Sequence, residues 1–251
     1  VKDDDLTVRM AAVKTLGSMG AAAKDAVPAL IQALRDADWE IRTAAATALE
    51  DIGIAAKRVF PDLEIAVNEI RAVLSCMAYG KAQEAYHQKD YDHDGILEYA
   101  QAIRTGETKK NPGLCDAALL PRQYAEAEGL PGNRSSYKGY RFKILKGQAE
   151  LTPGGLKKYM ENGNMIAGHA VVAYPAEYGK TGRSVFVMNY TGGIFEKDLR
   201  SLEDTTAFVT NSIDFQVDVS WSLARQITLQ PPVHVPAALK KIDEQKENAR
   251  F

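Results

Sequence analysis

The clearest pattern of hydrophobic and polar positions lies between residues 139 and 199 and predicts β-strands. Residues 140–144 alternate apolar with charged side chains, the period-two pattern of a strand with one buried face. Residues 165–174 are nearly continuously apolar, which indicates a strand buried on both faces. Residues 184–190 alternate again, and a Gly-Gly turn leads to a hairpin partner over residues 194–197. The pattern predicts a small antiparallel meander that needs a covering helix, with Phe186, Met188 and Tyr190 on one side and Val185 and Val187 on the other.

Helical periodicity precedes the predicted sheet. Apolar residues recur at helical spacing after Pro61, and the only helix breaker before Asp90 is Gly80. This predicts either one helix of about 27 residues or two helices with a bend at Gly80. Residues 70–88 are the expected cover for the sheet, while the residues before them close the preceding helical region. Because no Ser/Gly/Pro-rich linker intervenes, we expect a rigid joint.

The first 75 residues repeat with an offset of 33. Val8-Arg9 returns as Ile41-Arg42, and Val27-Pro28 returns as Phe60-Pro61, with alanines and glycines in matching places. Each unit predicts a helix, a glycine-bearing turn and a second helix opened by proline. Asp38 has the position of an N-cap.

This repeat resembles HEAT repeats of the short bacterial kind, which have an Asp-rich turn before V-R-x-A-A. The resemblance implies an α-solenoid whose usual role is protein binding, although a simple spacer is the alternative. Two units are fewer than such an array usually needs for independent stability. We therefore expect either further repeats upstream or support from the second domain. The chain starts at Val1, inside a repeat, and is expected to be a processed or partial product.

An acidic turn follows the long predicted helix. Residues 90–95 read D-Y-D-H-D-G, which places three carboxylates in a tight turn that glycine can close. Calcium prefers six to eight oxygen ligands, but the twelfth position, where an EF-hand has glutamate, is Gln101. Two interpretations remain, a solvated turn with an exposed His93 or a shortened calcium loop. The predicted Ca²⁺ ligands are Asp90, Asp92, Asp94 and Glu98.

The segments GYRFKIL, AYPAEYGKTG and GIFEKDL resemble an uncharacterised family of exported bacterial domains. That family has the layout of the globular heads of type IV pilins and type II secretion pseudopilins: a long helix, an acidic turn and a short antiparallel meander. The resemblance covers residues 66–222 and implies an extracytoplasmic location, but no established reaction. Pilins begin with an apolar membrane helix, whereas this chain carries charged side chains there, which argues against assembly by the pilus route. These are Asp62, Glu64, Glu69 and Arg71.

The expected fold is therefore α+β, with a short α-solenoid followed by a pilin-like domain. We expect HEAT-like repeats over residues 1–65 and the pilin-like domain over residues 66–222. Residues 223–251 should form an extended, proline-containing tail and a short terminal helix, either frayed or docked on another chain.

Composition narrows the partners. The chain has 251 residues, 45% hydrophobic and 25% charged, with a net charge of −2, which is ordinary for a soluble globular protein. Such a net charge predicts binding neither to nucleic acid nor to an anionic membrane. No apolar run approaches the roughly 18 residues of a membrane span. Cys76 and Cys115 have no C-x-x-C or zinc spacing, so they are either free thiols or one disulfide.

No recognisable catalytic set is present in the sequence. Ser184 lacks a G-x-S-x-G elbow, Cys115 lacks an evident histidine partner, and His169 is expected in the core. The loop over residues 174–183 is either a packed structural loop or a contact surface. In the second case the partner contacts are Tyr178, Lys180 and Arg183.

The function expected from these observations is that of a non-enzymatic assembly subunit. It would contact other protein subunits, or further copies of itself, in an extracytoplasmic complex or filament-like assembly. The alternatives are a calcium-binding envelope module and an enzyme whose site has no recognisable motif.

Overall fold

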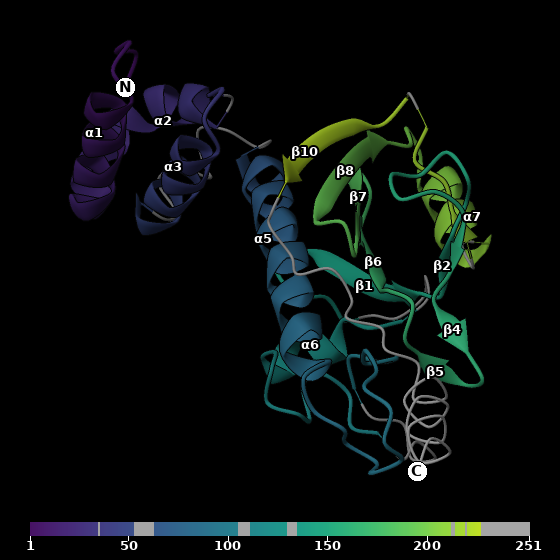
Figure 1. Ribbon diagram of the computed structural model, residues 1–251. Coiled ribbons are helices and arrows are strands. Elements are labelled where there is room, and N and C mark those ends of the chain that lie inside the picture. The colour runs from purple at the N-terminus through teal and green to yellow at the C-terminus, as the bar shows by residue number, and fades with distance from the viewer. Residues whose placement is uncertain are drawn as a thin grey trace, which may run out of the picture.

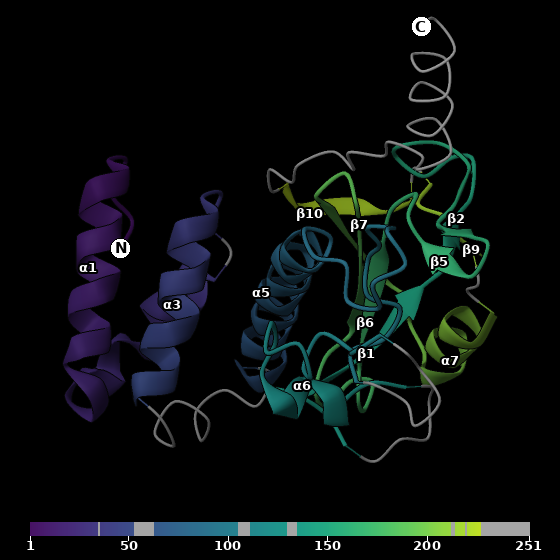
Figure 2. The same ribbon diagram turned by 60° about the horizontal axis from the view of Figure 1, so that its bottom comes forward.

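The computed structural model describes residues 1–34, 36–52, 63–104, 111–129, 135–211, 214–218 and 220–226. A lobe of helices lies beside a mixed domain in which one long helix stands next to a twisted sheet (Figures 1 and 2). This confirms the expected combination of N-terminal helices with an antiparallel sheet. The predicted tail over residues 227–251 lies outside the described residues.

The helical lobe follows the repeat. Helices α1 and α3 occupy equivalent places in the two units and pack against each other, and a short helix that proline opens follows α1. Asp38 caps α3 as predicted, because its carboxylate accepts the N–H groups of Glu40 and Ile41. The elements are α1 (Leu6–Ser18), η1 (Gly20–Ala26), α2 (Val27–Ala33) and α3 (Trp39–Ile52).

Helix α5 (Leu63–Tyr86) joins the lobe to the mixed domain. It is one continuous helix of 24 residues that passes through Gly80 without interruption, so the alternative of two helices is wrong. Its N-terminal part contacts α3, and its length packs on β6 and β7 (Figure 1). The predicted shared helix is therefore present, because the same element follows the last repeat and covers the sheet.

The main sheet has five antiparallel strands in the order β1-β6-β7-β8-β10. The predicted alternation is confirmed within β7: Phe186 and Met188 join the core under α5, and Val185 and Val187 join a second core on the opposite face. The placement of Tyr190 beside Phe186 and Met188 is wrong, because Tyr190 follows the last residue of β7 and packs against the second core, next to Tyr159. The strands are β1 (Tyr140–Leu145), β6 (Ala170–Pro175), β7 (Ser184–Asn189), β8 (Gly193–Asp198) and β10 (Ser222–Gln226).

The second face of the sheet has a cover that the sequence pattern did not predict. Helix α7 (Leu202–Asn211) contacts β6, and that core also contains Phe215 from a short strand and Tyr159 from the residue between two short strands. The remaining elements are α6 (Arg122–Glu126), β2 (Gly147–Gln148), β3 (Lys157–Lys158), β4 (Met160–Glu161), β5 (Asn164–Met165) and β9 (Asp214–Phe215).

Two strand predictions need correction. The apolar run over residues 165–174 is not one strand, because Met165 ends β5 and β6 begins only at Ala170. Between them Gly168 has a positive φ of 146°, and a side chain there would meet the rings of Tyr159 and Tyr190. Strand β10 also crosses the expected boundary after residue 222, since it pairs with β8 up to Gln226.

Candidate functional site

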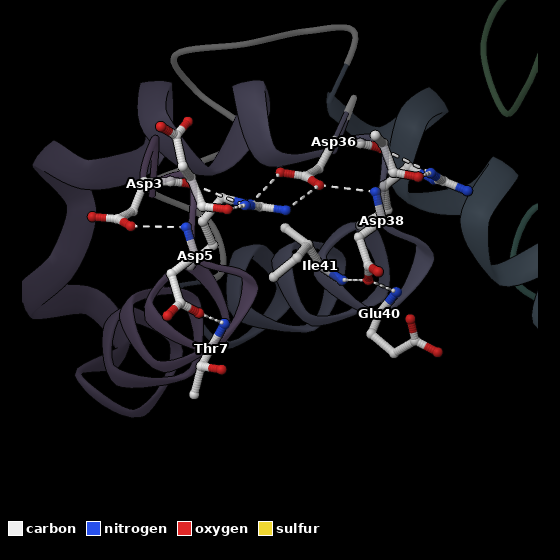
Figure 3. Close-up of polar contacts among 11 residues, drawn as sticks. Asp3, Asp5, Thr7, Asp36, Asp38, Glu40 and Ile41 are labelled. Atoms are coloured by element: carbon white, nitrogen blue, oxygen red, sulfur yellow. Dashed lines mark hydrogen bonds and ion pairs between the residues drawn. The ribbon is translucent and has the colours of Figure 1, made fainter.

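The two repeat units carry matching Asp-rich loops (Figure 3). In the first, Asp3 accepts the N–H of Asp5 at 2.9 Å, and Asp5 caps α1 by accepting the N–H of Thr7 at 2.7 Å. In the second, Asp36 accepts the N–H of Asp38 at 2.9 Å, and Asp38 caps α3. The loops are therefore built alike, residue for residue, at the offset of 33.

The arginines that follow these loops have different surroundings. Arg9 donates Nη1 to the carbonyls of Asp3 and Asp4, and its Nε lies 3.0 Å from the carboxylate of Asp36 in the next unit. Arg42 donates Nη1 to the carbonyls of Asp36 and Ala37 in the same way. Within the described part of the chain, however, no carboxylate forms an ion pair with Arg42.

The absence of this partner follows from the chain order. Counting 33 residues on from Asp36 leads to Glu69, which lies within α5 and not in a third repeat loop. The guanidinium of Arg42 instead lies over the ring of Trp39, 5.1 Å from its centroid. The sheet domain stands where another unit would continue the array.

Arg42 lines a cleft of about 670 Å³ between the helical lobe and the mixed domain. One wall comes from α2 and α3, and the other walls come from α5 and the β7-β8-β10 side of the sheet. The lining combines apolar side chains with four charged ones, those of Arg42, Glu69, Arg183 and Glu196. The apolar part of the lining includes Ile31, Leu34 and Trp39 from the lobe, and Ile70, Phe186 and Leu223 from the domain.

Two carboxylates share the cleft with Arg42. Glu69 accepts the backbone N–H groups of Arg183 and Ser184 at 2.9 and 3.1 Å, which ties α5 to the start of β7. Burial raises the pKa of Glu196, and the negative charge of Glu69 raises it further, while Arg42 opposes the shift. Glu196 is therefore a desolvated acid that lies within the electrostatic reach of Arg42 without an ion pair.

The three residues predicted to contact a partner have separate surroundings. Arg183 lines the cleft. Tyr178 donates its hydroxyl to Asp198 at 2.7 Å, and Lys180 pairs with Glu177 at 2.8 Å on the exposed loop. Only Arg183 of the three thus belongs to the cleft.

The acidic turn brings its three aspartates together. Carboxylate oxygens of Asp90, Asp92 and Asp94 lie within 4.8 Å of one another. Asp90 accepts the N–H groups of Gly95 and His93, and these hydrogen bonds lower its pKa. Gly95 has a positive φ of 84°, the conformation expected for the turn, and His93 is exposed as predicted.

Glu98 lies outside this group of three but next to it. It is only 5% exposed, accepts from the amides of Asn111 and Gln101, and has its pKa raised by burial and by Asp92. The buried Oδ1 of Asn111 has no hydrogen-bond partner among the described residues. A hollow of about 190 Å³ brings Asp92, Glu98 and Asn111 together. These hard oxygen donors are the residues that could hold calcium.

Neither cysteine has the surroundings of a nucleophile. Cys76 and Cys115 are free thiols, so the structure does not contain the disulfide that was one sequence interpretation. Burial raises the pKa of Cys76 and raises that of Cys115 to about 11. Both thiols therefore stay protonated and unreactive near neutral pH.

His169 is buried as predicted, but its neighbours are aromatic. Its ring lies between Tyr79 and Tyr99, at centroid distances of 5.5 and 4.9 Å. Burial, together with the nearby His87, lowers its pKa to about 3. His169 is thus a neutral core residue at physiological pH, and Nδ1 finds no hydrogen-bond partner within the described residues.

Comparison with known proteins gives two family matches. A family model described as "Protein of unknown function (DUF2950)" matches residues 51–224, and a model of HEAT repeats matches residues 1–73. The matches overlap at the start of α5, the element that the two parts share. No curated protein and no solved structure matches. Among the described residues, no helix combines the length and apolar character needed to cross a membrane. The chain belongs to the DUF2950 family and carries HEAT repeats at its N-terminus.

Proposed function

We propose that this DUF2950 family member is a non-enzymatic assembly subunit that binds a segment of another protein in the cleft between its repeats and its sheet. The observation that carries the proposal is the cleft itself. Its walls come from both modules, its lining combines apolar with charged side chains, and Arg42 lines it without a carboxylate partner among the described residues. HEAT repeats commonly bind proteins through such inner surfaces.

The partner segment is expected to be apolar with an acidic side chain. Trp39, Ile70 and Leu223 offer contacts for apolar side chains from three different walls. Arg42 carries the same guanidinium group with which Arg9 binds the carboxylate of Asp36. This planar group matches the geometry of a carboxylate, so an acidic side chain is the expected partner. An extended segment fits the site best, because β10 is the last strand of the described sheet at the cleft wall.

Selection of binders from a random peptide display library tests this proposal. Peptides that pair an Asp or Glu with apolar residues should be enriched, and binding should weaken about tenfold or more in Leu223→Glu, which places a charge on an exposed cleft side chain. Leu97→Glu is the matched control, because Leu97 is also exposed but lies outside the cleft. Selected peptides that bind both variants as tightly as the native protein would sink the proposal.

The assembly is further proposed to be pilin-like and extracytoplasmic. The order of a long helix, an Asp-rich turn and an antiparallel meander supports this, together with the resemblance of residues 66–222 to exported domains. Cell fractionation of the native producer provides the test. Recovery in the cytoplasmic fraction alone would exclude the proposed location while leaving the cleft untouched.

Calcium binding at the acidic turn is a second proposed function. The convergence of Asp90, Asp92 and Asp94, with the unpartnered Oδ1 of Asn111 near Glu98, favours it. Calcium should raise the melting temperature of the native protein, since a ligand at about 100 times its Kd stabilises by about 2.7 kcal/mol. Asp92→Asn should abolish the rise, while Asp218→Asn, an acid outside this group, should keep it. Equal melting temperatures with calcium and with chelator would exclude a structural site.

A substitution of Glu98 distinguishes a calcium site from a solvated turn that binds no calcium. Its folded-state pKa is raised, so the ionised carboxylate destabilises the fold above its unfolded pKa and ceases to do so once it is protonated. Glu98→Gln should therefore raise the melting temperature in chelator at neutral pH. In calcium the same variant should lose part of the native response, which no solvated turn would show.

A further inference from the structure

The loop between β2 and β3 exposes two leucines. The side chains of Leu151 and Leu156 are 64% and 70% exposed, more than any other large hydrophobic residue in the described part of the chain. Single exposed leucines are common on protein surfaces. Here two of them lie on one short loop, next to a Pro-Gly-Gly sequence, and form an apolar tip. Whether this tip can serve as a contact surface depends on how firmly the loop is held.

Buried polar side chains hold this loop in place. Gln148 donates to the carbonyls of Pro153 and Gly155 at 3.1 and 2.7 Å, and Asn189 donates to Pro153 at 2.9 Å. The hydroxyl of Thr152 donates to the carbonyl of Phe215 at 3.1 Å. Gln148, Asn189 and Thr152 are all buried. The leucines are therefore presented by a fixed loop, so little ordering is needed when a partner covers them.

Positive charge lies at the base of the leucine loop. Lys146 and Lys158 are exposed at the ends of β2 and β3 that lie away from the loop, where Gly147 pairs with Lys158. Lys157 lies over the ring of Tyr190, 4.2 Å from its centroid, and the Tyr190 hydroxyl reaches the carbonyl of Gly154. Glu150 is the one acidic residue between Lys146 and Lys158. This order suits an anionic lipid surface. The leucines at the tip can enter the acyl region, the amphipathic tyrosine can lie at the interface, and the lysines at the base can contact the headgroups.

The loop lies away from the protein-binding cleft. Strand β2 is on the side of the mixed domain opposite the helical lobe in both views (Figures 1 and 2). A surface bound at the loop would therefore leave the cleft accessible to a partner.

We propose that the β2–β3 loop is a peripheral membrane contact that inserts Leu151 and Leu156 among the acyl chains of an anionic bilayer. The lysines bind the lipid headgroups, and Tyr190 lies at the level of the interface. This contact requires no membrane-spanning helix. It is independent of the cleft, so either proposal stands without the other.

Co-sedimentation with vesicles tests the contact. The full chain should sediment with phosphatidylglycerol-containing vesicles and bind pure phosphatidylcholine vesicles at least about tenfold more weakly. The double variant Leu151→Ser/Leu156→Ser should lose binding by a similar factor, and Lys146→Gln/Lys158→Gln should lose the preference for anionic lipid. The matched control is Leu6→Ser/Leu97→Ser, which removes two exposed leucines elsewhere and should bind like the native chain.

Circular dichroism spectra should be the same for all variants, because each substitution is at an exposed site. Differences in vesicle binding then reflect the contact and not the fold. Failure of the native chain to sediment with anionic vesicles overturns the proposal. Equal binding of the Leu151→Ser/Leu156→Ser variant and the native chain does so as well. A protein partner that the same variant loses, with vesicle binding intact, would assign the loop to a protein interface instead.

Discussion

The loops before α1 and α3 are nearly identical in their hydrogen bonds but differ in what lies beyond them. The first loop is linked to the second, because Arg9 forms an ion pair with the carboxylate of Asp36. The position 33 residues on from Asp36 lies within α5, and Arg42 lines the cleft beside the mixed domain. The comparison teaches that, at the end of the array, the contact between repeats is replaced by the cleft that we propose as a binding surface. The chemistry of Arg9 indicates what Arg42 would bind.

The same comparison holds for the apolar positions. Val8 and Ile41 are equivalent in the repeat, yet Val8 is 47% exposed and Ile41 is fully buried. Helix α3 lies inside the lobe, with α1 on one side and α5 on another, whereas α1 packs mainly on α3. Position within the array, and not residue type, sets the contribution of each site to stability.

The largest expected effect separates these two positions. Ile41→Ala should lower the free energy of unfolding by about 2–5 kcal/mol, because it removes buried methyl groups and leaves a cavity. Val8→Ala should change it by less than about 0.5 kcal/mol, as is usual for surface substitutions. Urea denaturation followed by circular dichroism measures both. Similar losses in the two variants would show that the two units are buried alike.

A smaller effect distinguishes the arginines. Arg9→Gln removes a part-buried ion pair and should cost about 1.5–3 kcal/mol, since the carboxylate of Asp36 loses its charged partner. Arg42→Gln should cost less, because Arg42 donates to two backbone carbonyls and lies over a tryptophan ring without pairing with a carboxylate among the described residues. The same denaturation experiment ranks them. An Arg42 variant less stable than the Arg9 variant would mean that Arg42 has a structural carboxylate partner.

The smallest effect is the pH response that the two loops share. The N–H of Thr7 lowers the pKa of Asp5; for Asp38, desolvation raises the pKa, but hydrogen bonds from Glu40 and Ile41 outweigh it. Both folded-state values lie below the ordinary 3.8, so this stabilisation is complete above that pH and is lost as pH falls through the folded values. The helicity of the Asp38→Asn variant should therefore fall less on acidification than the helicity of the native chain. Identical acid transitions by circular dichroism would contradict this.

Much of the fold follows from patterns local in sequence. The repeat, the long helix, β1, β7 and the β7–β8 hairpin follow from periodicity and turn residues. Helix α7 was missed although Ser201 and Asp204 form a capping pair at its start, with bonds of 2.9 and 2.6 Å. The break before β6 depends on aromatic rings from elsewhere in the chain against Gly168, which no local pattern reveals.

The candidate sites divide in the same way. The acidic turn was predicted because its three aspartates are close together in sequence. The cleft was not, since it gathers α2, α3, α5 and three strands that only the folded chain brings together. One signal was available: an offset of 33 from Asp36 reaches Glu69 inside a helix, so Arg42 lacks the acidic partner that the repeat supplies to Arg9.

The affinity of one selected acidic peptide for two cleft variants tests the central claim most directly. Isothermal titration at neutral pH should show weaker binding to Arg42→Gln, because the carboxylate loses its guanidinium partner. Binding to Glu196→Gln should be tighter, because the substitution removes a partly buried negative charge that repels the carboxylate of the peptide. Opposite shifts support a cleft that binds an acidic, apolar segment through Arg42. Unchanged affinity in both variants, or weaker binding to Glu196→Gln, would contradict it.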